Sequence, residues 1–199
     1  MTKGLFIVFE GVDGSGKSTQ MSMLKDQLEK HDKDVVLTRE PTDGIVGELI
    51  RRYAESRSRS LRPETEALLF AADRVEHSRE IKRLMEEGKV VISDRYLHSS
   101  LAYQGAAGVD RGWIRELNKH TLQPDLVILL DIDPERSLNR VTYRDKTVFE
   151  EDVYLRKVRE IYREYAEKGE LISIDASKTI DEVQIEVIRL VEAQLSGFI

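Results

Sequence analysis

Residues 11–18 constrain the fold of this chain more than any other segment, because they match the pattern G-x-x-x-x-G-K-[ST] in a telling context. The apolar run Leu5–Phe9 precedes them and is expected to be a buried strand, and a helical pattern begins at Lys17. A strand, a glycine-rich turn and a helix in this order wrap backbone N–H groups around a phosphate chain. The sequence therefore predicts a phosphate-binding loop at the carboxyl end of the first strand.

The residue types inside this loop fit that role. Gly11, Gly14 and Gly16 let the backbone turn inward, because they have no Cβ in the way. Lys17 is expected to bring a positive charge to the outer phosphates, and the Ser18 hydroxyl is expected to ligate Mg²⁺. The residues predicted to contact the nucleotide phosphates are Gly11, Val12, Asp13, Gly14, Ser15, Gly16, Lys17, Ser18 and Thr19.

Five short apolar runs alternate with longer stretches of helical periodicity. The runs are nearly continuous and rich in β-branched residues, which is typical of strands buried on both faces of a sheet. Helical crossovers between such strands predict an α/β fold with a five-stranded parallel sheet covered on both faces, formed by residues 1–199 as a single domain. The predicted strands are Leu5–Phe9, Val35–Thr38, Val90–Ser93, Leu126–Leu130 and Leu171–Ile174. The predicted helices are Lys17–Lys30, Val46–Glu55, Glu64–Glu87, Ser99–Ala106, Arg111–His120, Glu135–Val141, Asp152–Lys168 and Ile180–Leu195.

The overall charge and composition limit the partners of the chain. Its 199 residues carry a formal net charge of −6, and an acidic surface is a poor general binder of nucleic acid. The first apolar run is too short for a signal segment, and no run approaches the roughly 20 residues of a membrane span. The absence of cysteine excludes disulfides, thiolate zinc sites and cysteine nucleophiles. We expect a cytoplasmic protein that binds neither nucleic acid nor membrane.

Charged residues directly follow the predicted strands. They are therefore expected at the carboxyl ends of the strands, where ligands bind in a parallel sheet. Arg39 follows the second strand and Arg95 the third, so both are expected on the same edge as Lys17. Two arginines beside a phosphate loop suggest a second anionic group that faces the terminal phosphate of a nucleotide. A kinase with a phosphorylated acceptor needs this second cationic cluster, whereas a simple NTPase does not. Asp94 is a candidate for assisting Mg²⁺ together with Ser18.

The segment 142–152 lies between two predicted helices and contains Arg144 and Lys146, with Arg140 just before it. Phosphoryl transfer depends mainly on positioning and on charge neutralisation, which mobile cations closing over the phosphates would supply. Such a cover would also exclude water. We interpret the segment as a short mobile lid, with an exposed solvated connector as the alternative.

Strings spread over essentially the whole chain resemble the thymidylate kinase family, and their combination in this order is highly specific. The resemblance implies a P-loop NTPase fold, transfer of a phosphoryl group from ATP to dTMP with Mg²⁺, and a homodimer. The nearest alternative is a kinase for another deoxynucleoside or nucleoside monophosphate. A nucleotide-dependent switch or binding module is a further alternative, although the Asn-Lys-x-Asp string usual in guanine-specific switches does not occur here. The strings are Phe9–Gln20, Thr38–Pro41, Leu68–Arg74, Asp94–Tyr96 with Ser99–Gly105, and Ile174–Ser177.

The resemblance assigns the acceptor side residue by residue. Arg39 and Arg95 match a pair that grips the acceptor monophosphate, and Asp13 matches an acidic residue near the sugar 3′-hydroxyl. Phe70 matches an aromatic residue that stacks on thymine, although periodicity alone favours a core phenylalanine there. Arg74 lies one helical turn further along the same face and matches a residue that hydrogen-bonds a base carbonyl.

Three further residues complete the pyrimidine pocket that the resemblance implies. Ser100 matches a polar position facing thymine N3, Tyr103 matches a residue that crowds the 2′ position and disfavours ribose, and Gln104 follows in the pocket. On the donor side, Arg140 matches an arginine that stacks on adenine. Ala176 lies in a loop that matches the border of the adenine site.

The phosphate loop departs from family members that carry a basic residue in it, because this chain has Gly14 and Ser15 there. Members without that residue tend to place the catalytic cation in the lid, which makes Arg144 the first candidate and Lys146 the second. For the implied homodimer, the predicted helices 64–87 and 99–106 are the candidate contact surfaces. The residues expected to act in the transfer itself are Lys17, Arg95, Arg144 and Asp13.

Overall fold

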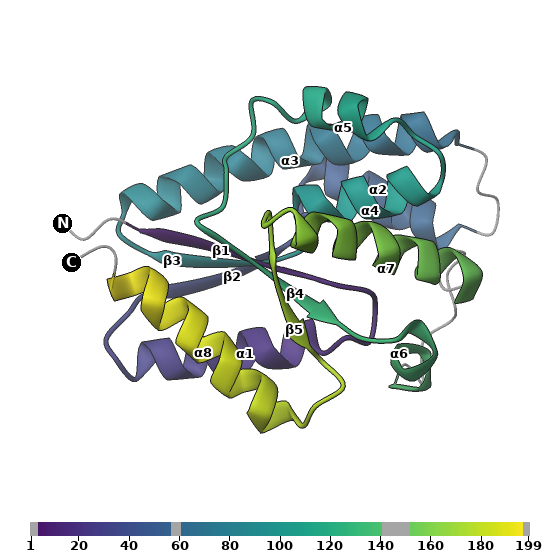
Figure 1. The fold of residues 1–199 in the computed structure, drawn as a ribbon. Coiled ribbons are helices and arrows are strands. Elements are labelled where there is room, and N and C mark those ends of the chain that lie inside the picture. Colours follow the sequence, from purple (N-terminus) through teal and green to yellow (C-terminus); the bar gives the residue numbers. More distant parts are fainter. Residues whose placement is uncertain (1–3, 57–60, 141–151, 197–199) are drawn as a thin grey trace.

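The computed structural model describes residues 4–56, 61–140 and 152–196, which build a central sheet between two layers of helices (Figure 1). The sheet has five strands in the order β2-β3-β1-β4-β5, and every neighbouring pair is parallel. The predicted α/β architecture is confirmed, and the strand ends agree with the predicted ones to within one residue. The strands are β1 (Leu5–Glu10), β2 (Val35–Arg39), β3 (Val90–Asp94), β4 (Leu126–Asp131) and β5 (Ile172–Asp175).

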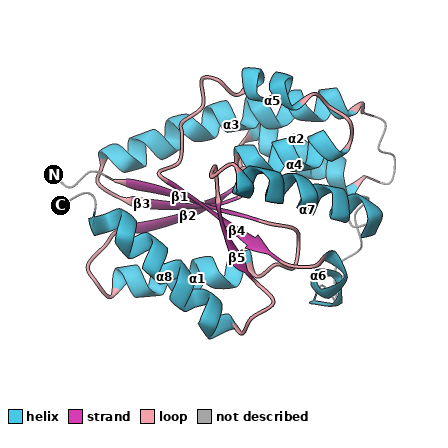
Figure 2. Cartoon of the chain, viewed as in Figure 1, coloured by secondary structure: helices cyan, strands magenta, loops and turns pink. Residues whose placement is uncertain are grey.

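Helices cover both faces of the sheet, as Figure 2 shows. Helices α1 and α8 pack on one face, α3 and α7 pack on the other, and α4 lies against both α3 and α7. The predicted helices are present, and the largest difference is that α5 ends at Leu117 rather than at His120. The helices are α1 (Lys17–Glu29), α2 (Ile45–Glu55), α3 (Pro63–Glu86), α4 (Leu97–Ala106), α5 (Arg111–Leu117), α6 (Pro134–Arg140), α7 (Asp152–Glu167) and α8 (Ile180–Ser196).

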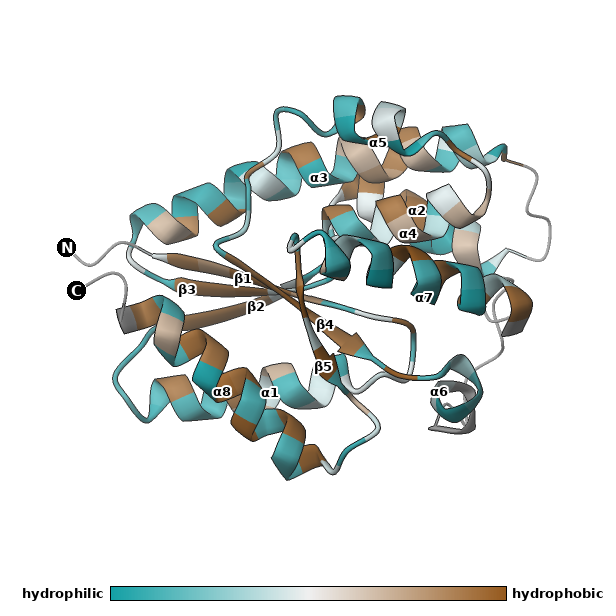
Figure 3. Cartoon of the chain, viewed as in Figure 1, coloured by the Kyte–Doolittle hydropathy of each residue, from teal (hydrophilic) through white to brown (hydrophobic). Residues whose placement is uncertain are grey.

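The central strands are the most apolar part of the described chain (Figure 3). All six residues of β1 are buried, because the strand has neighbours on both sides and helices above and below. Its register places Phe9 opposite Asp94 of β3. The segments that leave the carboxyl ends of β1 and β3 therefore start from rigid supports. None of the described helices is both long enough and apolar enough to cross a bilayer.

Helix α2 packs closely against the turn that follows β2. A Cβ added at Gly47 would overlap the backbone oxygen of Thr42 and lie 2.6 Å from its nitrogen. Thr42 is itself fixed, because its N–H and its hydroxyl donate to the two carboxylate oxygens of Asp73 on α3, at 2.8 and 2.6 Å. The turn therefore contacts both α2 and α3. Its close approach to α2 is possible because Gly47 has no side chain.

The substitution Gly47→Ala tests this packing. It should lower the free energy of unfolding by about 1–3 kcal/mol, the usual cost of forcing atoms into a filled site, although alanine favours a helix by about 1 kcal/mol over glycine. Urea unfolding followed by circular dichroism measures the change. Glu48→Ala, on the exposed side of the same turn, is the control and should alter stability by less than about 0.5 kcal/mol. A Gly47→Ala protein as stable as the wild type would contradict the packing.

Candidate active site

The loop after β1 has the backbone shape predicted for a phosphate cradle. Gly11, Gly14 and Gly16 have φ angles of 142°, 76° and 96°, which lie in the region that favours glycine. A Cβ at Gly11 would lie 2.7 Å from the backbone oxygen of Leu130, so β4 also excludes a side chain there. The loop ends at Lys17, the first residue of α1. The predicted sequence of strand, glycine turn and helix N-terminus is confirmed.

Lys17 is a buried cation inside this loop. Its side chain is only 6% exposed, and its ammonium donates to the backbone oxygens of Gly11 and Val12, at 3.2 Å each. Burial lowers the pKa of Lys17, and the neighbouring Arg95 lowers it further, while Asp94 at 3.8 Å acts in the opposite direction. A desolvated cation of this kind gains most from a nearby anion, such as the phosphates of a nucleotide.

Asp94 provides the observation that fits a magnesium ion. Its buried Oδ1 has no hydrogen-bond partner among the described residues, and its closest cation is Lys17. Asp94 and Ser18 line the same hollow, of about 340 Å³, beside the phosphate loop. Mg²⁺ is commonly held by one or two protein oxygens together with water and substrate phosphates.

A second pocket, with a cavity volume of about 230 Å³, opens beside the loop. Helices α2, α3 and α4 and the ends of β1, β2 and β3 surround it. Of the eight residues predicted for the acceptor side, seven line this pocket and only Arg39 does not. Its lining residues are Asp13, Glu40, Pro41, Ile50, Arg51, Ala54, Phe70, Arg74, Arg95, Ser99, Ser100, Tyr103 and Gln104.

Arg95 joins the phosphate loop to this pocket. Its guanidinium donates to the Asp13 carboxylate at 2.7 Å, to Ser99 Oγ at 3.0 Å and to the Tyr103 hydroxyl at 3.2 Å. The guanidinium carbon also lies 4.9 Å from the centre of the Tyr103 ring. Its backbone has a φ of 72°, which is unusual for a residue with a side chain. These contacts hold the cation at the mouth of the pocket that faces the loop.

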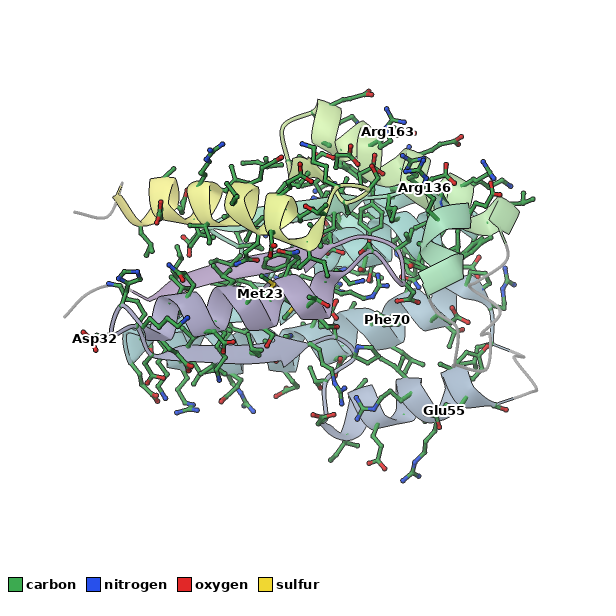
Figure 4. All side chains as sticks on the ribbon, turned by 90° about the horizontal axis from the view of Figure 1, so that it is seen from below. Met23, Asp32, Glu55, Phe70, Arg136 and Arg163 are labelled. Atoms are coloured by element: carbon green, nitrogen blue, oxygen red, sulfur yellow. The ribbon has the colours of Figure 1, made fainter. Side chains whose placement is uncertain are left out.

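The far end of the pocket is suited to a planar, polar ring. Phe70 of α3 is half-buried and lies outside the buried core, so the interpretation as a core phenylalanine is wrong (Figure 4). Gln104 is buried, and its Oε1 has no hydrogen-bond partner within the described ranges. Burial raises the pKa of Tyr103 to about 12, so its hydroxyl stays protonated. An apolar ring face and an amide oxygen with unused hydrogen-bonding capacity therefore line the same pocket.

Arg74 lies in the same pocket but is fully buried and engaged with the protein. Two of its nitrogens donate to one carboxylate oxygen of Glu40, at 2.8 and 2.6 Å. It also donates to Asn118 Oδ1 at 2.8 Å and to Ser100 Oγ at 3.0 Å. Glu40 therefore neutralises the charge of Arg74, the residue that the resemblance assigns to a carbonyl of the substrate base. Asn118 thus accepts one of the two Nη1 hydrogens.

The structure places Arg39 away from the acceptor pocket. Its side chain is 60% exposed and donates to Asp43 at 2.7 Å. It lines the hollow that contains Ser18 and Asp94 instead. Arg39 and Arg95 thus line different hollows in this structure, and the assignment of Arg39 to the acceptor monophosphate remains a proposal.

Arg51 of α2 is a pocket residue that the sequence analysis missed. It lies in the acceptor pocket, its Nη1 donates to the backbone oxygens of Pro41 and Thr42, and its Nη2 lies 3.2 Å from Asp43. An arginine on an amphipathic helix usually faces solvent, so no pattern in the sequence identified it. Only the packing of α2 against the turn after β2 reveals its position.

The donor side is described in part. Arg144 and Lys146, and with them the predicted lid, lie outside the described residues, and so does the side chain of Arg140. Ala176, which follows β5, is buried, and its N–H donates to the backbone oxygen of Asp131 at 2.8 Å. The loop predicted to border an adenine thus lies at the carboxyl end of the sheet, on the same edge as the phosphate loop.

A phosphate-binding loop beside a second pocket with its own fixed cation defines a P-loop kinase that acts on a small acceptor. A family model described as thymidylate kinase matches residues 9–187. Proteins described as probable thymidylate kinases are similar over nearly their full length. The one from Thermococcus gammatolerans is 46% identical over 98% of this chain and 99% of its own, and the one from Methanocaldococcus jannaschii is 43% identical over 94% and 96%. The chain belongs to the thymidylate kinase family, as predicted, and is a phosphotransferase that uses ATP.

Neutralising Glu40 tests the buried pair at the base of the pocket. Glu40→Gln keeps the shape of the side chain but leaves the Arg74 charge uncompensated, which should lower the free energy of unfolding by about 3 kcal/mol or more. Glu80→Gln removes an exposed partner of Arg83 and should cost less than about 1 kcal/mol. Thermal unfolding of both variants gives the comparison. Equal stabilities would show that Arg74 does not depend on Glu40.

Proposed function

We propose that this site transfers a phosphoryl group from ATP to dTMP, with the donor phosphates on the loop 11–18 and dTMP in the pocket between α2, α3 and α4. The reaction yields ADP and dTDP. The observation that carries the proposal is the position of Arg95, whose guanidinium contacts Asp13 in the loop and Tyr103 in the pocket. A phosphate bound by Arg95 would lie between the two substrates, where the transferred group must pass.

Charge neutralisation is the main task of the site in this reaction, because phosphoryl transfer proceeds through a loose transition state. Lys17 supplies a buried cation on the donor side, and Arg95 supplies one on the acceptor side. When bound, Mg²⁺ would neutralise charge on the donor phosphates, with Ser18 and Asp94 as the residues that would hold it. Asp13 orients Arg95, and it remains our candidate for a contact with the sugar 3′-hydroxyl.

Recognition of the base rests on groups that have hydrogen-bonding capacity left. Phe70 offers a ring face for stacking, and the resemblance makes Arg74 the donor to a base carbonyl. The buried Gln104 Oε1 accepts no bond from the protein among the described residues and suits an N–H of the base. Ser100 lies beside Arg74, and the ring of Tyr103 closes the side of the pocket where a 2′-hydroxyl would require room. These features favour a deoxypyrimidine.

Two assignments keep their basis in the sequence alone. The resemblance makes Arg140 the arginine that stacks on adenine and Arg144, ahead of Lys146, the lid cation that shares transition-state charge with Lys17. Cytoplasmic localisation likewise remains a prediction.

A homodimer also remains a proposal, and the structure narrows the surface it would use. Helix α4 is unsuitable as a contact surface, because most of its residues are buried by the rest of the chain. Helix α3 keeps Leu68 and Val75 exposed, and the neighbouring α2 exposes Ile45 and Leu49. We therefore place the proposed contact on α2 and α3.

A panel of acceptors tests the proposed reaction. ADP release is measured with dTMP, dUMP, thymidine or no acceptor. dTMP should be used fastest, and dUMP, which lacks one methyl group, should lose about tenfold in kcat/KM. Thymidine should lose about 100-fold or more, because a lost charged contact costs about 2–5 kcal/mol. Equal turnover without an acceptor would contradict a kinase, and a preference for thymidine would contradict a phosphorylated acceptor.

Asp94→Asn tests the proposed magnesium site. The variant should need about tenfold or more additional Mg²⁺ for half-maximal activity, because an amide oxygen is a weaker ligand than a carboxylate. Asp34→Asn is the matched control and should leave the Mg²⁺ requirement unchanged. Asp34 directly precedes β2, at the amino end of the strand and therefore away from the phosphate loop. A Mg²⁺ titration of initial rates compares them, and an unchanged requirement in Asp94→Asn would remove Asp94 from the metal site.

A further inference from the structure

Glu10 is a buried carboxylate that the reaction described above does not use. It is the last residue of β1, directly before the phosphate loop, and its exposed fraction is 0%. A buried charge of this kind is costly unless donors surround it. The identity of those donors therefore shows what Glu10 does.

Four donors surround the Glu10 carboxylate. One oxygen accepts the backbone N–H groups of Tyr96 and Ser99, at 2.9 and 3.1 Å. The other accepts the Ser99 hydroxyl at 2.6 Å and the Tyr162 hydroxyl at 2.8 Å. Burial, followed by the charge of Glu10, raises the pKa of Tyr162, so the phenol keeps the proton that it donates. All four acceptor positions of an ionised carboxylate are thus occupied, which leaves none to take a proton from a substrate.

One of these bonds, together with a bond to Phe9, fixes the backbone around Arg95. The N–H of Arg95 donates to the backbone oxygen of Phe9 at 2.9 Å, and the next N–H along the chain, that of Tyr96, donates to Glu10. The strained left-handed conformation of Arg95 is therefore held on both sides by β1. Glu10 also caps α4, because it accepts the N–H of Ser99 in the first turn of that helix. Tyr96, the residue at the cap position, provides no side-chain hydrogen bond of its own.

The bond from the Ser99 hydroxyl connects Glu10 to the Arg95 side chain. Ser99 donates its single hydroxyl hydrogen to Glu10, so the oxygen of the same hydroxyl can accept from Arg95 Nη1, at 3.0 Å. The direction of the Ser99 hydroxyl is thus set by the carboxylate behind it. The hydroxyl of Tyr162, on α7, donates to the same Glu10 oxygen as the Ser99 hydroxyl.

We propose that Glu10 is a positioning residue for the acceptor phosphate, which acts on Arg95 through Ser99 and the backbone of Tyr96 and does not itself touch the substrate. This inference rests on the proposed function, since it assigns the phosphate of dTMP to Arg95. It predicts an effect confined to ligands that carry the phosphate. A merely structural role of Glu10 would weaken the binding of every ligand and would not separate dTMP from thymidine.

The substitution Glu10→Gln tests the proposal with little change in shape. An amide nitrogen facing the two hydroxyls becomes a donor to both, so both hydroxyl hydrogens lose their acceptor. The two hydroxyls lie 2.9 Å apart, so one can donate to the other, and the remaining hydrogen is left without an acceptor or is turned toward Arg95. Calorimetric titration should show a loss of dTMP affinity of about tenfold, the effect of one charged hydrogen bond. The affinities for thymidine and for ATP should stay within about threefold of the wild type, well below that loss.

Two further variants make the result decisive. Glu76→Gln, an exposed carboxylate of α3 that pairs with Arg79, is the matched control and should leave all three affinities unchanged. Ser99→Ala removes the connecting hydroxyl but keeps both backbone donors, so it still tests the positioning role if Glu10→Gln does not fold. It should lose dTMP affinity by about threefold or more with thymidine unaffected.

The possible outcomes separate this inference from the proposed function. Wild-type protein that binds dTMP no better than thymidine would overturn the proposed function and this inference with it. Wild-type protein that prefers dTMP, together with a folded Glu10→Gln variant that binds dTMP normally, would overturn the positioning role alone. A parallel loss of dTMP, thymidine and ATP affinity would also overturn it, since that pattern marks a structural role.

Discussion

The ion pair between Arg95 and Asp13 is the contact on which the arrangement of the site depends. Arg95 lies beside the phosphate loop with only 16% of its side chain exposed, so it needs fixed acceptors to remain there. Asp13, Ser99 and Tyr103 supply them from the loop and from α4. Because these groups come from two elements, the pair couples the donor side of the site to the acceptor side.

Buried charges with fixed partners recur through the site. Lys17 is held by loop carbonyls, Arg74 by Glu40, and Glu10 by four donors. Such groups cost free energy to bury, and their positions are then set before any substrate arrives. Catalysis of phosphoryl transfer gains from this, since charges that are already in place need no reorganisation during the reaction.

The sequence predicted the parts that depend on local pattern. Strands buried on both faces appear as continuous apolar runs, and the glycines of the phosphate loop occur at the positions where φ is positive. It could not predict which charged groups neutralise one another across the fold. The pairing of Arg74 with Glu40 joins residues 34 positions apart, and the bond from Tyr162 to Glu10 spans 152 positions. For the same reason Arg51 was missed, since its contact with Asp43 is set by tertiary packing.

The central claim is that the monophosphate of the acceptor binds at Arg95 and not on the phosphate loop. A crystal structure of the chain with dTMP tests it most directly. The account predicts a phosphate oxygen about 3 Å from the Arg95 guanidinium, with the thymine ring against Phe70. A dTMP phosphate seated in the loop 11–18, or a thymine ring away from Phe70, would contradict it.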